Sequence, residues 1–152
     1  MSESINLATI TISIHVHSTE NLNKVMGIFS YFLPISPEEI KDKVNMVNLT
    51  GDYGNDIIIL TYRIKFKKEI KHFVQILSDC VPLSHKQYLY RNFQPSNVFF
   101  LRFNKQLLSR GIFRLSQYDD VVHVSLKFSS FTKKNEKTNI QDYLLNTGII
   151  AV

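Results

Sequence analysis

The sequence predicts an α+β fold in two layers, with a mostly antiparallel sheet and helices packed on one of its faces. Two observations support this fold class. Several segments alternate apolar and polar residues, which indicates strands, and short turns suited to hairpins separate some of them. Between these lie segments whose apolar residues repeat every three or four positions, which indicates amphipathic helices. Because hairpins join antiparallel neighbours, we expect the helices to cover one face and leave the other open.

The first part of the chain begins with a strand and a helix. Residues 7–17 alternate strictly and are predicted to form the first strand. Residues 18–20 supply a hydroxyl to cap a helix and an acid for its first turn. A single apolar stripe predicts a helix over residues 22–33, which Pro34 would end. Residues 36–39 fit a short helical turn with proline at its first position.

A hairpin and two further helices are expected next. Residues 43–50 and 57–66 read as strands, joined by a turn-forming cluster with two glycines over residues 51–55. A second amphipathic helix is predicted over residues 70–81. Residues 84–87 fit the capping box of a third, shorter helix.

The last part of the chain adds three strands and two helices. Residues 98–103 and 121–131 are predicted strands, with a brief helix over residues 105–110 and a short strand over residues 112–115 between them. A terminal helix is expected to end at Gly148, since glycine is favoured just past a helix.

Length and composition fit one domain over residues 1–152, in which residues 132–152 form a loop and the terminal helix. With 44% hydrophobic residues, the chain is not of the disordered class. Cys80 is the only cysteine, so no internal disulfide can form. The sequence lacks a signal-peptide pattern and any apolar run of the ~18 residues that cross a membrane. We therefore expect a cytoplasmic protein without a membrane partner.

The polar side of the predicted strands carries basic and hydroxyl residues but no acid. All thirteen acids fall in other positions, and the net charge is +5. Arginine and lysine neutralise phosphates, and hydroxyls donate to phosphate or ribose oxygens, so this pattern favours RNA as the partner. A structural explanation stays open, because strands disfavour acids and charges protect sheet edges. The positions expected on this face are Thr11, Ser13, His15, His17, Thr61, Arg63, Lys65, Arg102, Arg114, His123, Ser125 and Lys127.

Catalytic signatures are absent from the sequence. It contains no nucleophile elbow, P-loop or dinucleotide-binding glycine run, so we expect no enzyme activity and no cofactor. His15 and His17 share one side of a strand and form a feasible metal pair. His123 would complete a site only if its strand is adjacent, and a small metal-dependent nuclease on these three histidines stays an alternative. Phe100, beside Arg102, is the aromatic residue expected to point outward.

Four short motifs resemble those of one known family in order and spacing. They are residues 17–20, 51–55, 103–106 and 119–121, and the resemblance spans about residues 10–130. The family is an archaeal group of small RNA-binding proteins regarded as exosome subunits. The positions that match its motifs are His17, Thr19, Glu20, Gly51, Tyr53, Gly54, Asn55, Lys105 and Gln106.

The resemblance implies a fold like that of the ribosomal protein that binds 5S rRNA, and a role in RNA processing or degradation. It supplies no catalytic residue. We therefore expect a non-catalytic RNA-binding protein; the alternative is a protein-interaction subunit that docks on the exosome or another ribonucleoprotein without touching RNA. The residues expected to contact RNA are Arg63, Lys65, Arg102, Lys105, Arg110, Lys127, His15, His17 and, by stacking, Tyr53.

Overall fold

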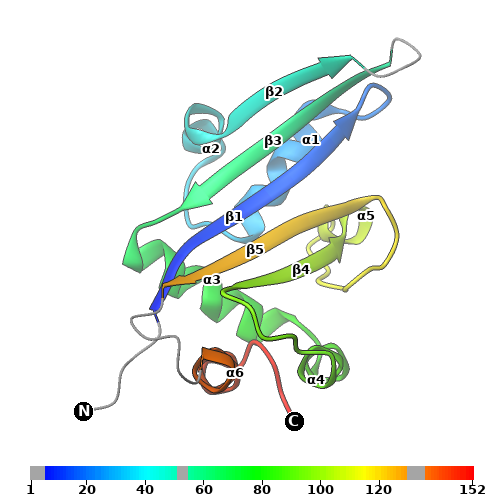
Figure 1. The fold of residues 1–152 in the computed structure, drawn as a ribbon. Coiled ribbons are helices and arrows are strands. Elements are labelled where there is room, and N and C mark those ends of the chain that lie inside the picture. The colour runs from blue at the N-terminus through cyan, green and yellow to red at the C-terminus, as the bar shows by residue number, and fades with distance from the viewer. Residues whose placement is uncertain (1–5, 51–54, 130–135) are drawn as a thin grey trace.

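A computed structural model describes residues 6–50, 55–129 and 136–152, and it confirms the α+β fold (Figure 1). Five strands form one antiparallel sheet in the order β2-β3-β1-β5-β4. The strands are β1 (Asn6–His17), β2 (Asn45–Thr50), β3 (Asp56–Ile64), β4 (Val98–Asn104) and β5 (Val121–Ser129). The first strand of the chain therefore lies at the centre of the sheet.

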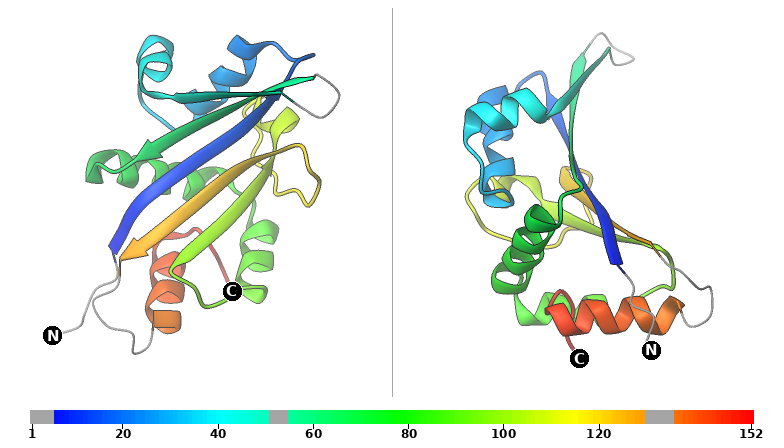
Figure 2. Two further views of the ribbon diagram at one scale, coloured as in Figure 1. Left: turned by 45° about the horizontal axis from the view of Figure 1, so that its top comes forward. Right: turned by 90° about the vertical axis from the view of Figure 1, so that its left-hand side faces the viewer.

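The described helices leave one face of the sheet bare. In the right-hand view of Figure 2, α1, α2 and α3 lie on one side of the sheet, and α4 and α6 lie near its lower end. The helices are α1 (Leu22–Met26), the 3-10 helix η1 (Gly27–Tyr31), α2 (Pro37–Lys43), α3 (Lys67–Cys80), α4 (Leu83–Arg91), α5 (Lys105–Leu108) and α6 (Glu136–Thr147). None of them is long and apolar enough to span a membrane, among the residues described.

The core lies between the sheet and these helices. The alternation in β1 correctly predicts its buried face. Ile10, Ile12 and Ile14 are completely inaccessible to solvent. Phe32 is the centre of an aromatic cluster: it stacks on Phe73 of α3 at 5.0 Å between ring centroids and contacts Phe103 and Phe113. The buried cluster includes residues of β1, β3, β4 and β5.

The helix predicted over residues 22–33 is shorter and tighter than expected. Asn21, not residues 18–20, caps it by accepting from the Lys24 backbone amide at 3.1 Å. After Met26 the chain continues as a 3-10 turn, in which the Ser30 hydroxyl bonds to the Gly27 carbonyl. A serine that bonds locally to the backbone competes with regular α-helix, which accounts for the tightening.

Two expectations for the remaining elements were wrong. The capping box over residues 84–87 is absent: α4 begins at Leu83, with Pro82 at its N-cap and no side-chain cap. The strand over residues 112–115 reduces to an isolated bridge between Leu115 and Phe103. Arg114 therefore does not lie on a strand of the sheet. In contrast, the terminal helix ends as expected, with Gly148 at φ +81° just beyond it.

Candidate functional site

The strand order brings the polar sides of four strands into one continuous surface. Thr11 of β1 lies between Arg63 of β3 and Ser125 of β5, and His123 of β5 lies opposite Arg102 of β4. Cross-strand partners share a face of the sheet, so the structure supplies the strand order that the sequence leaves open. We call this surface the open face; it comprises Thr11, Ser13, His15, His17, Thr61, Arg63, Phe100, Arg102, His123, Ser125 and Lys127.

Basic side chains on the open face are exposed and lack acidic partners. Arg63, Arg102 and Lys127 are all exposed. Within the described ranges, none of the three has a carboxylate within 4.0 Å. Arg102 is nevertheless held in place, because its Nη2 donates to the Tyr118 carbonyl at 2.9 Å. Unpaired cations on one surface leave a positive potential that an anionic ligand can use.

Two histidines of the open face lie close together. The rings of His15 and His123 lie 6.3 Å apart between centroids, on adjacent strands. Burial, the charge of Arg102 and that of His15 lower the pKa of His123. His123 is therefore largely neutral at pH 7 and adds a hydrogen-bonding ring, rather than a charge, between the cations.

The open face becomes apolar toward β2. Ile59 lies between His15 of β1 and Val47 of β2, and Leu49 follows two residues along β2. Val47 is 42% exposed and Leu49 is 47% exposed. This patch was not predicted from the sequence. In residues 43–50, apolar residues occur on both sides of the strand, and this pattern indicates a strand with no clearly buried face.

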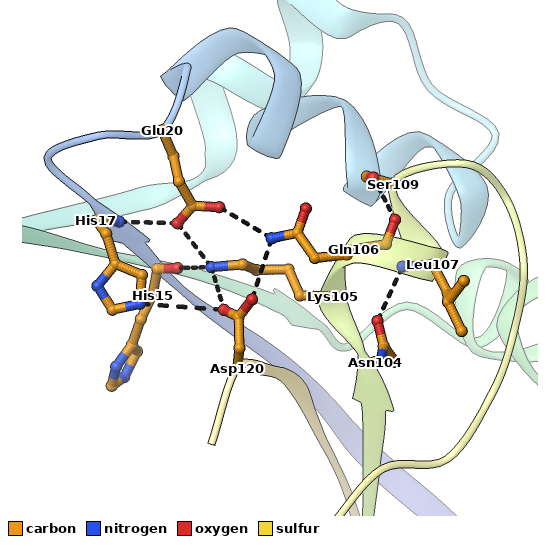
Figure 3. Close-up of polar contacts among 9 residues, drawn as sticks. All are labelled: His15, His17, Glu20, Asn104, Lys105, Gln106, Leu107, Ser109 and Asp120. Atoms are coloured by element: carbon orange, nitrogen blue, oxygen red, sulfur yellow. Dashed lines mark hydrogen bonds and ion pairs between the residues drawn. The ribbon is translucent and has the colours of Figure 1, made fainter. Parts of the chain in front are cut away.

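A second cluster of charges closes the end of the sheet where β1 stops (Figure 3). Lys105 is 2% exposed, and its Nζ lies 2.8 Å from Glu20 Oε1 and 2.7 Å from Asp120 Oδ1. The same ammonium donates to the backbone carbonyl of His15 at 2.8 Å. Gln106 completes the group by donating to Asp120 Oδ2 at 3.0 Å. We call Glu20, Lys105, Gln106 and Asp120 the Lys105 network.

Local structure explains how the network assembles. Asn104 ends β4 and caps α5 by accepting from the Leu107 amide at 2.9 Å, which places Lys105 in the first turn of that helix. The turn after β1 closes when the His17 amide donates to Glu20 Oε1 at 3.0 Å. Asp120 directly precedes β5. Three family motifs that lie far apart along the chain therefore meet at one lysine.

Both carboxyl groups of the network are held in their charged form. Burial alone raises the pKa of Glu20, but hydrogen bonds from Lys105 and the His17 amide, with the charge of Lys105, lower it overall. Burial likewise raises the pKa of Asp120, and hydrogen bonds from Lys105 and Gln106 outweigh it. The network therefore holds one ammonium against two carboxylates, and these three groups together carry a net charge of −1.

The same place holds the one set of three potential metal ligands found among the described residues. These are His17, Glu20 and Asp120, whose ligand atoms lie within 4.8 Å of one another. The ammonium of Lys105 already lies against both carboxylates, so a metal ion bound there would be repelled by its positive charge. The histidine triplet of the nuclease alternative does not form such a set there.

The remaining expected contact residues fall in different places. Lys105 is buried and engaged, so its ammonium is not available to a phosphate, contrary to the expectation from sequence. Lys65 is exposed directly after β3, and Arg110 is exposed just after α5, away from the strands. Gly51, Tyr53 and Gly54 lie outside the described residues, and Asn55 is exposed before β3. Phe100 points outward as expected and is 68% exposed.

Comparison with known proteins agrees with the fold. A family model described as RNA binding matches residues 9–128. The chain is 28% identical over 142 residues to the RNA-binding protein PAB1135 of Pyrococcus abyssi, with 90% of this chain and 91% of that protein covered. It is 30% identical over 145 residues to the uncharacterized protein MJ0213 of Methanocaldococcus jannaschii, with 92% and 97% covered.

Solved structures extend the comparison. Protein SSO0741 of Sulfolobus solfataricus, a DUF54 protein, superposes with a TM-score of 0.67 at 30% identity, over 91% of this chain and 98% of that one. Mth689 of Methanothermobacter thermautotrophicus, also a DUF54 protein, gives a TM-score of 0.71 at 19% identity, over 89% and 93%. The second match bears on the fold alone.

Proposed function

The chain belongs to the family whose model is described as RNA binding, and from this membership we propose that it binds RNA across the open face of its sheet. The observation that carries the proposal is the set of exposed cations Arg63, Lys127 and Arg102 on β3, β5 and β4, without acidic partners among the described residues. The name of the Pyrococcus abyssi relative, an RNA-binding protein, supports the same reading.

The chemistry of the open face suits a phosphate backbone. Each cation that neutralises a phosphate releases a counterion, and contacts of this kind give Kd values of roughly 10⁻⁴–10⁻⁶ M at physiological salt. The hydroxyls of Thr11, Ser13 and Ser125 lie between the cations and are partly exposed. Hydroxyls can donate to phosphate oxygens or contact the ribose 2′-OH, by which proteins distinguish RNA from DNA.

The test is a titration of fluorescently labelled RNA at several salt concentrations, with wild-type protein and Arg63→Glu. The matched control is Lys71→Glu, which reverses an exposed charge on α3, on the covered side of the sheet. We expect Arg63→Glu to weaken binding at low salt and to flatten the salt dependence, while the control matches wild type. Equal binding by wild type and Arg63→Glu would rule out the open face as the RNA site.

We further propose that the protein is non-catalytic and acts in RNA processing or degradation, as the family resemblance implies. The cluster around Lys105 supports the first part, because the ammonium lies against both carboxylates, in the place that a metal ion would need. Metal analysis and an RNA-cleavage assay of the purified protein test it; metal-dependent cleavage that is lost in Asp120→Asn would overturn it.

The apolar patch of Val47 and Leu49 favours a second role, docking on the exosome or another ribonucleoprotein. The experiment is binding to purified exosome after nuclease treatment, with Leu49→Ser as the variant and Phe66→Ser, an exposed residue between β3 and α3, as the control. Nuclease-resistant binding that is lost in Leu49→Ser but kept in Phe66→Ser would support this role. Binding that disappears with nuclease would mean that RNA bridges the two partners, and would overturn it.

A further inference from the structure

A groove runs along the outer edge of β4, next to the open face. Its volume is about 660 Å³, within the range of small-ligand pockets, and its walls come from α4, β4 and residues 115–117. Phe100 and Arg102, which belong to the open face, also line this groove. A chain lying across the open face can therefore reach the groove without crossing the covered side of the sheet.

Two aromatic rings of the groove are left uncovered by the fold. Phe100 is 68% exposed in the middle of β4, and Tyr88 of α4 is 41% exposed. Exposing large aromatic rings forgoes the burial that normally stabilises them. Flat aromatic surfaces beside cations are the usual platform on which unpaired bases stack.

Hydrogen bonds within the groove fix its polar groups. Gln117 Nε2 donates to the Tyr88 hydroxyl at 3.1 Å, which leaves the amide oxygen of Gln117 free to accept. The Leu115 amide donates to His85 Nδ1 at 3.3 Å, so the neutral ring of His85 carries its proton on Nε2 and can donate. Burial and Arg114 lower the pKa of His85, which keeps this ring neutral at pH 7. Groups held in this way orient a ligand at a low entropic cost.

The backbone of Phe100 supplies a further donor and acceptor. β4 is the last strand of the sheet, and residues 114–116 bond only to its C-terminal half, through the Arg102 carbonyl at 2.9 Å and the Asn104 amide at 2.8 Å. Because alternate residues of a strand point their backbone groups to the same side, the amide and carbonyl of Phe100 face this outer edge as well. Within the described residues, these two groups make no backbone hydrogen bond on that side.

We propose that the β4-edge groove binds one unpaired base of an RNA whose backbone crosses the open face, with the base stacked on Phe100 and its edge contacting Arg102, Gln117 and the Phe100 backbone. This inference rests on the proposed RNA binding. A peptide strand fits the groove less well. Residues 114–116 already bond to the outer edge of β4 along its C-terminal half, so few residues of β4 are left to pair with a peptide. None of the nine lining residues carries a negative charge, which favours an anionic ligand.

The experiment uses RNA oligonucleotides that contain 2-aminopurine in a single-stranded region, and it follows both affinity and base fluorescence. We expect Phe100→Ala to weaken binding about tenfold, the effect of losing one stacked base, and to abolish quenching of the fluorescent base. Phe100→Tyr keeps a ring and should bind as wild type. The matched control is Phe66→Ala, which removes an equally exposed ring outside the groove.

The salt dependence separates this proposal from the one on which it depends. Phe100→Ala should leave the salt slope unchanged, because the phosphate contacts of Arg63 and Lys127 remain. If Phe100→Ala binds and quenches as wild type while Arg63→Glu loses affinity, the groove proposal is overturned and the open face still stands. If wild type binds no RNA at all, both proposals fall. A peptide that binds at the β4 edge without competing with RNA would also overturn the groove proposal.

Discussion

The Lys105 network and the open face are both built around cations near β1, but they differ in what surrounds each charge. Lys105 is 2% exposed and lies against two carboxylates and a carbonyl. Lys127, on β5, is exposed with no carboxylate within 4.0 Å among the described residues. The first charge is consumed in holding three chain segments together, whereas the second is available to a ligand. Burial and partners, not residue type, decide which task a lysine performs.

The largest effect is expected from Lys105→Met. The change leaves Glu20 and Asp120 close together without the ammonium between them, and removing one member of a buried ion pair costs about 3–5 kcal/mol. We expect a loss of about 3 kcal/mol, the lower end of that range, because the Asp120 side chain is 44% exposed and can be hydrated. Urea denaturation measures it. Lys127→Met is the control and should change stability by less than about 0.5 kcal/mol.

A reversal of this contrast would disprove the assignment of the two lysines. If Lys127→Met destabilises the fold as much as Lys105→Met does, the open-face charge is structural as well. If Lys105→Met folds normally and loses RNA binding, the network belongs to the binding site.

The next-largest effect is on RNA affinity, which should depend on Lys127 and not on Lys105. Lys127→Glu removes one phosphate contact, so the slope of log affinity against log salt should fall by about 0.7 for single-stranded RNA. Lys105→Met, assayed at a temperature where it stays folded, should retain the wild-type slope. Fluorescence anisotropy over a series of salt concentrations measures both slopes, and a reduced slope for Lys105→Met would contradict the separation of the two regions.

Acid is expected to weaken the network only below about pH 5. The pKa values of Glu20 and Asp120 in the folded protein lie below their ordinary values of 4.5 and 3.8. Their stabilising contribution is therefore complete above about pH 5 and is lost as pH falls through the folded-state pKa values. Urea midpoints from pH 7 to pH 3 should decline less steeply in Glu20→Gln than in wild type. Parallel curves would mean that the network does not govern acid sensitivity.

The smallest effect is a pH dependence of RNA binding through His123. Because the pKa of His123 is lowered, the ring gains its charge only below the ordinary histidine range. RNA affinity should be nearly constant from pH 8 to pH 7 and rise modestly toward pH 5.5, and His123→Gln should remove part of that rise. His72→Gln on α3 serves as the control, and an identical profile for His123→Gln would exclude a contact there.

Local periodicity was enough to predict the fold class and most elements. The alternation in residues 7–17 identified both the strand and its buried face, since Ile10, Ile12 and Ile14 all enter the core. It could not predict that this strand is central, because strand order depends on contacts between distant segments. For the same reason, the burial of Lys105 could not be predicted from the sequence. Its partners Glu20 and His15 lie 85 and 90 positions away along the chain.

The candidate site was predicted in part. The exposed cations of β3, β4 and β5 lie on the face expected from their alternation, as with Arg63 and Lys127. Arg114 was misplaced because a short apolar run cannot be distinguished from a loop that touches a strand once. The β4-edge groove could not be predicted, since its walls come from a helix, a strand and a loop that only the tertiary fold brings together.

The central position of β1 sets the order in which the protein can be completed during synthesis. β1 can pair with β3 once residue 64 has been made, but its other neighbour is β5, and Asn6 is opposite Ser129. Contacts between such distant segments form slowly and late. The surface that joins Arg63 to Lys127 and Arg102 is therefore completed only after residue 129 has been made.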